Sequence, residues 1–202
     1  MLRPQGHPLI AAAIDLVMAP MDRLRPRVVQ HARGRTLEIG AGTGLNFAYY
    51  ADDVELVAIE PDPHMLRRAR ARAERLGRAV ELVQTGAEAL PFEDDSFDTV
   101  VATWVFCTIP DAAGAAAEVA RVLKPGGVLL FVEHVHSDHA PARAVQHAIN
   151  PAWKQMAGGC QLVREPVALL EEAGLEIRDL RPWGGERWTV FPMLRGDAHK
   201  AP

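Results

Sequence analysis

The fold is decided by the stretch LEIGAGTG, Leu37 to Gly44. An apolar run passes directly into a turn that holds three glycines, and open parallel sheets bind ligands at such strand-to-helix turns. Glycine is required there because the backbone must turn sharply and let a ligand approach within contact distance. The dinucleotide-binding pattern G-x-G-x-x-G would place glycine at position 45. Leu45 stands there instead, so the spacing disfavours an NAD-dependent dehydrogenase.

Strand-like and helix-like segments alternate on both sides of this turn. The runs that predict strands are RTLEIGAGTG (35–44), VELVAIEPD (54–62), AVELVQTGAEALPF (79–92), FDTVVATWVF (97–106), VLLFVEHV (128–135), the second half of LVREPVALLEEAGLEIRDLRP (162–182) and RWTVFPML (187–194). The runs that predict helices are PHMLRRARARAERLG (63–77), AAGAAAEVARVLKPGG (112–127), which Pro125 and two glycines end, and the first half of 162–182. This alternation predicts an α/β fold: a single Rossmann-like doubly wound sheet, mostly parallel with an antiparallel last strand, and helices on both faces.

The chain length and the absence of internal repeats favour one domain over residues 1–202. We divide it into N-terminal lid helices (1–33), a cofactor-binding core (34–135), an irregular substrate-cap insert (136–162) and a C-terminal helix with strands (163–202). The basic run RRARARAERLGR (67–78) lacks interleaved aromatic residues, which favours a solvated helix face.

Composition excludes several function classes. A net charge of -4 and a pI near 6.1 argue against bulk electrostatic binding to nucleic acid. The two cysteines are too few for a disulfide scaffold or a four-cysteine zinc site. Oligomeric state cannot be predicted from the sequence.

The N-terminal run PLIAAAIDLVMAP (8–20) is apolar at helical spacing, but it is shorter than the roughly 20 residues that span a bilayer. We predict a lid or packing helix, with weak peripheral membrane contact as the alternative. No secretory signal is visible, so the expected location is the cytoplasm, free or peripheral to a membrane.

Glu60 ends the second predicted strand, twenty residues after Gly40. An acid at that place can accept hydrogen bonds from both hydroxyls of an adenosyl ribose. The structural alternative, an acid that caps the following helix, applies mainly to Asp62.

The glycine loop, Glu38 and Glu60 together resemble the class I S-adenosylmethionine-dependent methyltransferases, over about residues 35–135. The run EVARVLKPGGVLLFVEH (118–134) is typical of the branch that contains the ubiquinone and menaquinone biosynthetic enzymes. The run RAVQHAINPAWKQMAGGCQLVRE (143–165) is similar to the membrane-associated thiol methyltransferases of animals and their bacterial relatives. Two departures are the short N-terminal helix and Gly86, where many relatives carry an Asp that reaches the adenine.

The resemblance implies S-adenosyl-L-methionine as cofactor, S-adenosyl-L-homocysteine as product and a small-molecule acceptor. The implied cofactor residues are Glu38, Gly40, Ala41, Gly42, Gly44, Asn46, Glu60, Pro61, Met65, Gly86, Ala87, Glu88, Thr103 and Trp104. The candidate substrate residues are Phe106, Cys107, Gln146 and Trp153, for which core packing is the alternative.

The run EHVHSDHA (133–140) imitates a metal site, because His134, His136, Asp138 and His139 follow the H-x-H-x-D-H spacing of metallo-β-lactamases. Only 63 residues follow His139, which is too few for the second half of such a fold. We therefore predict no metal. His134 instead ends the fifth predicted strand, where its imidazole could act as general base or could fix the insert; His136 and His139 are expected in loops.

The predicted function is methyl transfer to a small hydrophobic acceptor, with a thiol as the leading candidate. The alternatives are O-, N- or C-methylation of a quinone precursor, a phenolic natural product or a phospholipid amine. A different class, a non-catalytic adenosyl-binding protein, is disfavoured by the intact glycine loop and acids.

Overall fold

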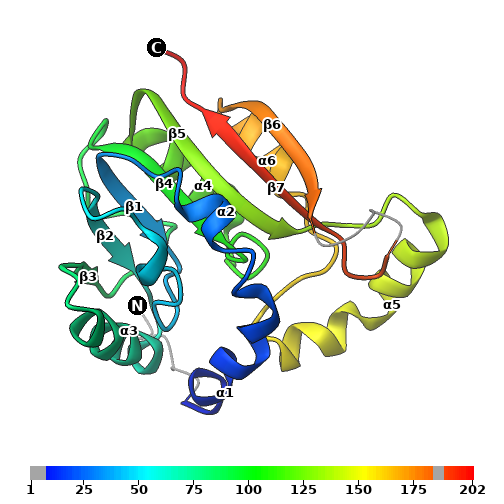
Figure 1. Ribbon diagram of the computed structural model, residues 1–202. Coiled ribbons are helices and arrows are strands. Elements are labelled where there is room, and N and C mark those ends of the chain that lie inside the picture. The colour runs from blue at the N-terminus through cyan, green and yellow to red at the C-terminus, as the bar shows by residue number, and fades with distance from the viewer. Residues whose placement is uncertain (1–7, 184–188) are drawn as a thin grey trace.

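The computed structural model describes residues 8–183 and 189–202 (Figure 1). Within these ranges the strands form one sheet in the order β3-β2-β1-β4-β5-β7-β6. The strands are β1 (Arg35–Ile39), β2 (Glu55–Ile59), β3 (Glu81–Val83), β4 (Phe97–Thr103), β5 (Leu123–His134), β6 (Glu176–Trp183) and β7 (Met193–His199). Strands β1 to β5 pair in parallel, and β7 is antiparallel to both β5 and β6. The predicted α/β sheet with an antiparallel last strand is confirmed.

The position of the last strand was predicted wrongly. The run 187–194 was expected, whereas β7 begins at Met193 and continues to His199; Arg187 and Trp188 lie outside the described residues. The segment MLRGDAH has little apolar alternation, but it lies inside the sheet and pairs with β5 on one side and β6 on the other. Tertiary pairing therefore decides this strand, not local β-propensity.

Helices cover both faces of the sheet. They are α1 (Pro8–Met18), η1 (Ala19–Met21), α2 (Pro26–Val29), η2 (Phe47–Tyr49), α3 (Pro63–Leu76), α4 (Ala112–Val122), α5 (Ala140–Met156) and α6 (Pro166–Glu172). Side chains of α4 and α6 pack into one hydrophobic cluster, and those of α2 and α3 pack into a second cluster on the other face. In Figure 1, α4 and α6 lie behind the sheet and α2 lies in front of it.

Helix α3, which follows β2, has well-formed ends. The Asp62 carboxylate accepts hydrogen bonds from the backbone N–H groups of His64 and Met65, and Pro63 occupies the first turn. Gly77 ends α3 in the left-handed conformation. The helix predicted over 63–77 is thus confirmed. Helix α4, by contrast, ends at Val122, and Pro125–Gly127 belong to the start of β5.

The insert expected to be irregular is mostly helical. Helix α5 runs for 17 residues and contains Pro151, a residue that removes one backbone donor from a helix interior. Its inward side chain Gln146 is fully buried and ties the helix to the rest of the chain. The Gln146 amide accepts a hydrogen bond from Ser137 N and donates to the carbonyls of Val135, Leu162 and Val190. These bonds stabilise a helix that local sequence does not predict.

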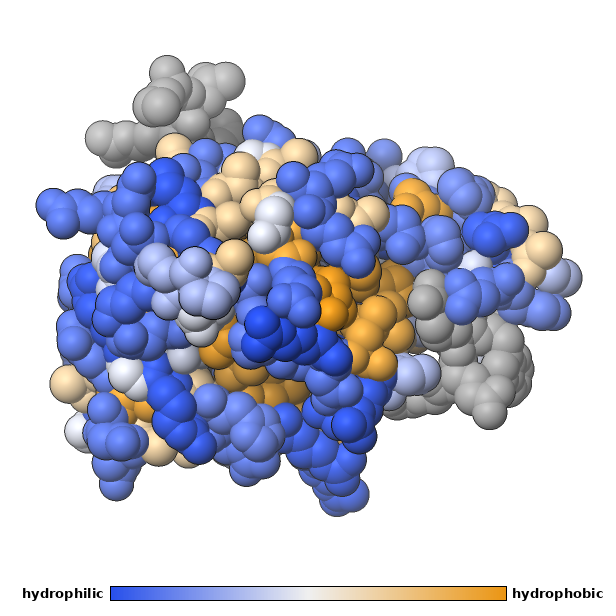
Figure 2. All heavy atoms as spheres, turned by 90° about the horizontal axis from the view of Figure 1, so that it is seen from above, coloured by the Kyte–Doolittle hydropathy of each residue, from blue (hydrophilic) through white to orange (hydrophobic). Residues whose placement is uncertain are grey.

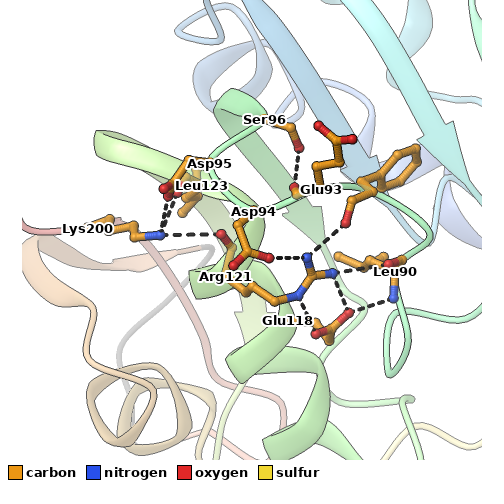
Figure 3. Close-up of polar contacts among 10 residues, drawn as sticks. Leu90, Glu93, Asp94, Asp95, Ser96, Glu118, Arg121, Leu123 and Lys200 are labelled. Carbon is orange, nitrogen blue, oxygen red and sulfur yellow. Dashed lines mark hydrogen bonds and ion pairs between the residues drawn. The ribbon is translucent and has the colours of Figure 1, made fainter.

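Arg121 holds the loop after β3 against α4 (Figure 3). Its guanidinium forms ion pairs with Glu118 and Asp94, each with an N···O distance of 2.7 Å, and donates to the carbonyls of Leu90 and Phe92. Glu118 in turn accepts from Leu90 N. This network fixes the loop whose earlier residues, 85–88, border the cavity described below.

Apolar residues also reach the surface. Figure 2 shows one face on which they gather in the middle, with hydrophilic residues around them. Helix α1 exposes Leu9, Leu16 and Val17, at 84%, 81% and 64%. None of the helices in residues 8–183 and 189–202 combines the length and apolar character that a membrane crossing requires.

Candidate functional site

A cavity of about 430 Å³ lies at the carboxyl ends of the parallel strands, within the size range of small-ligand sites. Its lining comes from α1, the glycine loop, the ends of β2, β3 and β4, and the turn after α5. The lining residues are Ile10, Ile14, Met18, Arg25, Gly40, Ala41, Gly42, Thr43, Leu45, Ile59, Glu60, Pro61, Asp62, Met65, Thr85, Gly86, Ala87, Glu88, Thr103, Trp104, Val105, Thr108, Ile109, Pro110, Ala157 and Gly158. Because β2–β3 and β4–β5 lie on opposite sides of β1, the cavity has a β2–β3 end and a β4–α5 end.

The glycine loop leaves room for a ligand. Gly40 has φ +60°, and a Cβ at this position would collide with the Val105 side chain. Gly42 has φ +58°, but its nearest neighbour would be Met65 Sδ, 4.0 Å from an added Cβ. Gly40 is therefore demanded by the fold, whereas Gly42 faces the space that a ligand would fill.

Glu60 lies at the β2–β3 end and is only 6% exposed. One carboxylate oxygen accepts a hydrogen bond from the backbone N–H of Gly42 at 2.9 Å. The other accepts one from the backbone N–H of Asp62, also at 2.9 Å. Burial raises the pKa of Glu60 above its usual value, although these two bonds act against the rise. Each oxygen keeps acceptor capacity, so the carboxylate can also receive two hydroxyl groups.

Glu38 lies beneath the loop, outside the cavity lining. Its carboxylate accepts hydrogen bonds from Asn46 Nδ2 and Tyr50 Oη, each at 2.9 Å. Complete burial raises its pKa to about 7, despite these bonds and the nearby Arg25 charge. Asn46 also donates to Thr103 Oγ1 and accepts from Arg25. Glu38 and Asn46 thus position the loop and the Arg25 side chain.

Arg25 was not singled out from the sequence. It is 5% exposed, borders the cavity, and donates to Asn46 Oδ1 at 2.9 Å. Its guanidinium lies 5.0 Å from the centre of the Trp104 ring, within range of a cation–π contact. Trp104 itself has φ +56°, an uncommon conformation for a non-glycine residue that turns its ring towards Arg25 and Met193. A buried cation in a cavity wall is suited to a carboxylate.

Glu88 occupies the place that a side chain at position 86 would take. A Cβ built on Gly86 would collide with the Glu88 carboxylate. Both residues and Ala87 border the β2–β3 end. The Glu88 carboxylate therefore lies where a side chain at position 86 would lie, and it can accept a hydrogen bond from an amino group.

Helix α1 covers the cavity, and its acidic residue, Asp15, forms ion pairs with α3. Asp15 forms ion pairs with Arg72 (N···O 2.7 Å) and Arg68 (3.1 Å), and it accepts the Thr43 hydroxyl. The arginine face of α3 that we expected to be solvated thus also anchors α1. The predicted lid helix lies over the site, with Ile10, Ile14 and Met18 facing the cavity.

The β4–α5 end is closed by two short turns. Thr108, Ile109 and Pro110 come from the turn after β4, and Ala157 and Gly158 come from the turn after α5. Arg164 supports the first turn by donating to the carbonyls of Phe106 and Ile109. Figure 1 shows α1 beside the far end of α5, and an added Cβ at Gly158 would lie 3.7 Å from Ile10 Cδ1.

Most predicted cofactor residues border the cavity; Glu38, Gly44 and Asn46 lie outside its lining. The predicted acceptor residues lie behind the wall instead. Phe106 and Gln146 are fully buried, and Trp153 packs against Phe191 with ring centres 5.0 Å apart. Cys107 and His134 lie with Cys160 in a separate cluster. Local sequence could not show which residues of these turns face the cavity.

The H-x-H-x-D-H residues do not assemble. In the described part of the chain, the group of His, Cys and acidic donors close enough to hold a metal is Cys107, His134 and Cys160. His136 instead forms an ion pair with Glu165, and His139 lies exposed at the start of α5.

Residues 37–131 match the family model described as a methyltransferase domain. Thiol S-methyltransferase TMT1B of Homo sapiens is 36% identical over 170 residues, which cover 81% of this chain and 70% of that protein. The chain belongs to the class I S-adenosylmethionine-dependent methyltransferases. Phosphatidylethanolamine N-methyltransferase of Cereibacter sphaeroides is 38% identical over 130 residues, covering 62% of this chain and 64% of that protein.

Solved structures show the same fold for this methyltransferase. A SAM-dependent methyltransferase from Aquifex aeolicus superposes with a TM-score of 0.68 at 16% identity, covering 96% of this chain and 99% of that one. The YcgJ protein of Bacillus subtilis superposes with a TM-score of 0.75 at 20% identity, covering 91% and 99%. The family resemblance and the enzyme class predicted from the sequence are confirmed.

Proposed function

We propose that this methyltransferase methylates the sulfur of a small apolar thiol. The relative TMT1B is named a thiol S-methyltransferase, and it aligns through the turn after α5 that borders the cavity. The single observation that carries the proposal is the chemistry of the β4–α5 end. Side chains of α1 together with Ile109, Pro110 and Ala157 make its wall largely apolar.

The acids in the described lining are Glu60, Asp62 and Glu88, all at the β2–β3 end. An amine acceptor must lose a proton with a pKa of about 10.4, and an apolar wall disfavours the charged forms of both an amine and a thiol. A thiol needs to lose a proton with a pKa of only about 8.5, so a reactive thiolate is reached more easily at neutral pH. The lower pKa of a free thiol therefore favours a thiol over an alkyl amine, and the apolar wall favours an apolar acceptor.

The residues present fit the cofactor of the family. Gly42 faces open space, Glu60 offers oxygens to the ribose hydroxyls, and Glu88 offers them to the adenine amino group. The buried Arg25 is suited to the carboxylate of the methionyl tail. When bound, the cofactor supplies an activated methyl group on a sulfonium. The chain then contributes mainly by positioning the acceptor in line with that methyl and by excluding water under α1.

His134 is the proposed general base. It ends β5 at the carboxyl edge of the sheet, behind the turns that close the β4–α5 end. Its Nδ1 lies 3.8 Å from Cys160 Sγ, so a role as base requires Nε2 to reach the acceptor proton from behind the wall, directly or through one water. A structural role, in which His134 only fixes the turn after α5, predicts different kinetics for His134→Ala.

We also propose weak peripheral contact between α1 and a lipid surface. The outward side of α1 carries Leu9, Leu16 and Val17, while its one charged residue, Asp15, is engaged with α3. Such a helix can lie on a bilayer and admit apolar acceptors from it. Co-sedimentation with neutral phosphatidylcholine vesicles should fall when Leu16 and Val17 are changed to Ser. Equal sedimentation of both proteins would remove this part of the proposal.

A mass-spectrometric methylation screen tests the acceptor class. Purified enzyme is incubated with cofactor and with matched alkyl thiols, aryl thiols, phenols, quinones and amines, including phosphatidylethanolamine. We expect S-methylated products at the highest kcat/KM from apolar thiols, with charged thiols such as glutathione poorer. Turnover confined to amines or phenols would overturn the thiol assignment and leave the methyltransferase class intact.

A further inference from the structure

Two cysteines and a histidine meet behind the wall of the β4–α5 end. Cys107 follows β4, His134 ends β5 and Cys160 follows α5, and their sulfur and nitrogen atoms all lie within 4.8 Å of one another. Cys160 Sγ is 3.8 Å from His134 Nδ1. Cys107 and Cys160 are 1% and 6% exposed. Methyl transfer needs neither thiol, because it requires no covalent intermediate with the protein.

The backbones that carry the two cysteines run side by side. Gln161 N donates to Cys107 O at 2.9 Å, which brings the peptide after Cys160 directly against Cys107. A second close approach lies at Gly159, where an added Cβ would be 3.4 Å from Thr108 O. A disulfide requires adjacent backbones and sulfur atoms about 2 Å apart. The backbones of this pair are adjacent, and the sulfurs, within 4.8 Å of each other, must still approach.

The two thiols differ in their electrostatic surroundings. The Cys107 thiol donates to Cys160, and this bond, together with His134, lowers the pKa of Cys160 to about 4 although burial opposes it. The same bond, burial and the Glu133 carboxylate raise the pKa of Cys107 well above its usual value. These surroundings favour the thiolate at Cys160 and the protonated thiol at Cys107, the arrangement found in pairs that oxidise readily.

A zinc ion fits the cluster less well. Structural zinc sites are closed by four ligands, whereas the described residues bring together three donors. The nearest carboxylate, Glu133, already accepts the backbone N–H groups of Val105, Phe106 and Cys107. A thiol pair beside a histidine needs no further residue, whereas a closed zinc site would need a fourth ligand.

We propose that Cys107 and Cys160 form a reversible disulfide that closes the β4–α5 end and switches methyl transfer off. The oxidant is a small hydroperoxide, and Cys160 comes two residues after the cavity-lining Gly158. The inference holds for any methyl acceptor, because it concerns the shape of the site and not the atom methylated.

Oxidation of the pair takes two steps. The Cys160 thiolate attacks the distal peroxide oxygen and becomes a sulfenic acid, and the hydroperoxide is reduced to an alcohol or water. Cys107 sulfur then attacks the Cys160 sulfur, the disulfide forms, and the hydroxyl leaves as water with the Cys107 proton. A small-molecule thiol restores both cysteines by thiol–disulfide exchange and is itself oxidised.

Closing the bond moves both walls of the cavity. The sulfur atoms must approach to about 2 Å, which draws the turn after α5 towards the turn after β4. Thr108 and Ile109 follow Cys107, and Ala157 and Gly158 precede Cys160, so the lining of this end shifts while the glycine loop does not. A displacement of about 1 Å at a reacting centre can lower a rate by roughly 100-fold.

The test uses the purified enzyme, treated with hydrogen peroxide and then separated from it. Peptide mass spectrometry should find a Cys107–Cys160 disulfide, and turnover should fall at least tenfold. Cofactor affinity by calorimetry should stay within twofold, and dithiothreitol should restore turnover. Cys107→Ser should instead yield a Cys160 sulfenic acid that dimedone traps, and Cys160→Ser should keep its own reduced-state turnover after peroxide.

Other results would contradict a regulatory Cys107–Cys160 disulfide. Peroxide inactivation that persists in Cys160→Ser, or that arises from methionine oxidation alone, would overturn it. Elemental analysis that finds one zinc per chain, with both thiols protected from peroxide until a chelator is added, would overturn it in favour of a metal site. A circular-dichroism spectrum and melting temperature for each variant establish that it is folded.

Discussion

Asp15 of α1 and Arg72 of α3 form an ion pair with an N···O distance of 2.7 Å, and this pair joins the predicted lid helix to the helix that packs beside the glycine loop. Arg72 also donates to the backbone carbonyl and hydroxyl of Thr43 in the glycine loop. The lid, the loop and α3 therefore share one polar junction. Since the rest of α1 is apolar and exposes Leu16 and Val17, Asp15 determines which side of the helix faces the site.

Asp15→Asn should loosen this lid. We expect a several-fold rise in acceptor KM and faster proteolysis within α1, with exposed Asp53→Asn as matched control. Burial raises the pKa of Asp15, but bonds from Thr43, Arg72 and Arg68 outweigh it and lower the pKa below 3.8. The ionised Asp15 carboxylate therefore stabilises the fold above about pH 4. This stabilisation is lost as the pH falls through the lower pKa of Asp15 in the folded state. Unchanged KM and proteolysis in Asp15→Asn would contradict this role of Asp15.

Glu60→Ala should weaken binding of the cofactor and of its demethylated product by about 1–3 kcal/mol, because ribose hydroxyls lose their acceptor. Isothermal calorimetry measures this, with exposed Glu74→Ala as control. Adenosine alone should show the same loss, since the contact is with the ribose. Equal affinities of wild type and Glu60→Ala would remove the ribose assignment. Gly42→Val should abolish binding by filling the open space over the loop.

The position of the glycine loop and Glu60 at one end of the cavity could be predicted from the sequence because these residues are close together along the chain. Gly40, Gly42 and Glu60 lie within two strand ends and one turn, and their spacing alone indicates their neighbours. The β4–α5 end could not, since Ile14, Thr108 and Gly158 come from three distant segments that only the fold brings together. Arg25 was missed for the same reason: a single arginine in a polar N-terminal turn gives no signal until burial and Trp104 identify it. The proximity of Cys107 and Cys160 likewise could not be predicted, because their spacing in the sequence does not indicate that they meet.

Arg25→Met should lower cofactor affinity about tenfold or more, because a charge-assisted hydrogen bond to the methionyl carboxylate is worth about 1.5–3 kcal/mol. A double-mutant cycle isolates the contact: decarboxylated cofactor product and intact product are each titrated into wild type and Arg25→Met. Wild type should favour the intact compound, and the variant should bind both alike. Equal discrimination by both proteins would show that Arg25 only supports Asn46 and Trp104.

Glu38→Gln should flatten the pH dependence of stability. Burial raises the pKa of Glu38 from 4.5 to about 7, so the folded state binds this proton more tightly than the unfolded state. The stability that the group contributes is therefore complete below about pH 4.5 and declines as pH rises to about 7, by an amount on the order of 3 kcal/mol. Urea unfolding at several pH values measures this decline. It should be smaller in Glu38→Gln, and parallel curves for the two proteins would contradict a raised pKa.

His134→Ala distinguishes a general base from a structural histidine. Removal of a base should lower turnover by about 10²–10⁴-fold while cofactor affinity changes little. The loss should shrink as pH approaches the pKa of the acceptor thiol, because the thiolate then forms without help, and it should be smaller for aryl than for alkyl thiols. A structural role, through the contact between His134 Nδ1 and Cys160 Sγ, predicts a loss that is independent of pH and acceptor acidity and is accompanied by lower thermal stability.

Rates measured against acceptor pKa for wild type, His134→Ala and the exposed control His139→Ala decide between the two roles. A uniform loss across the thiol series would assign His134 to the architecture of the wall, and the positioning of the acceptor would then account for the catalysis.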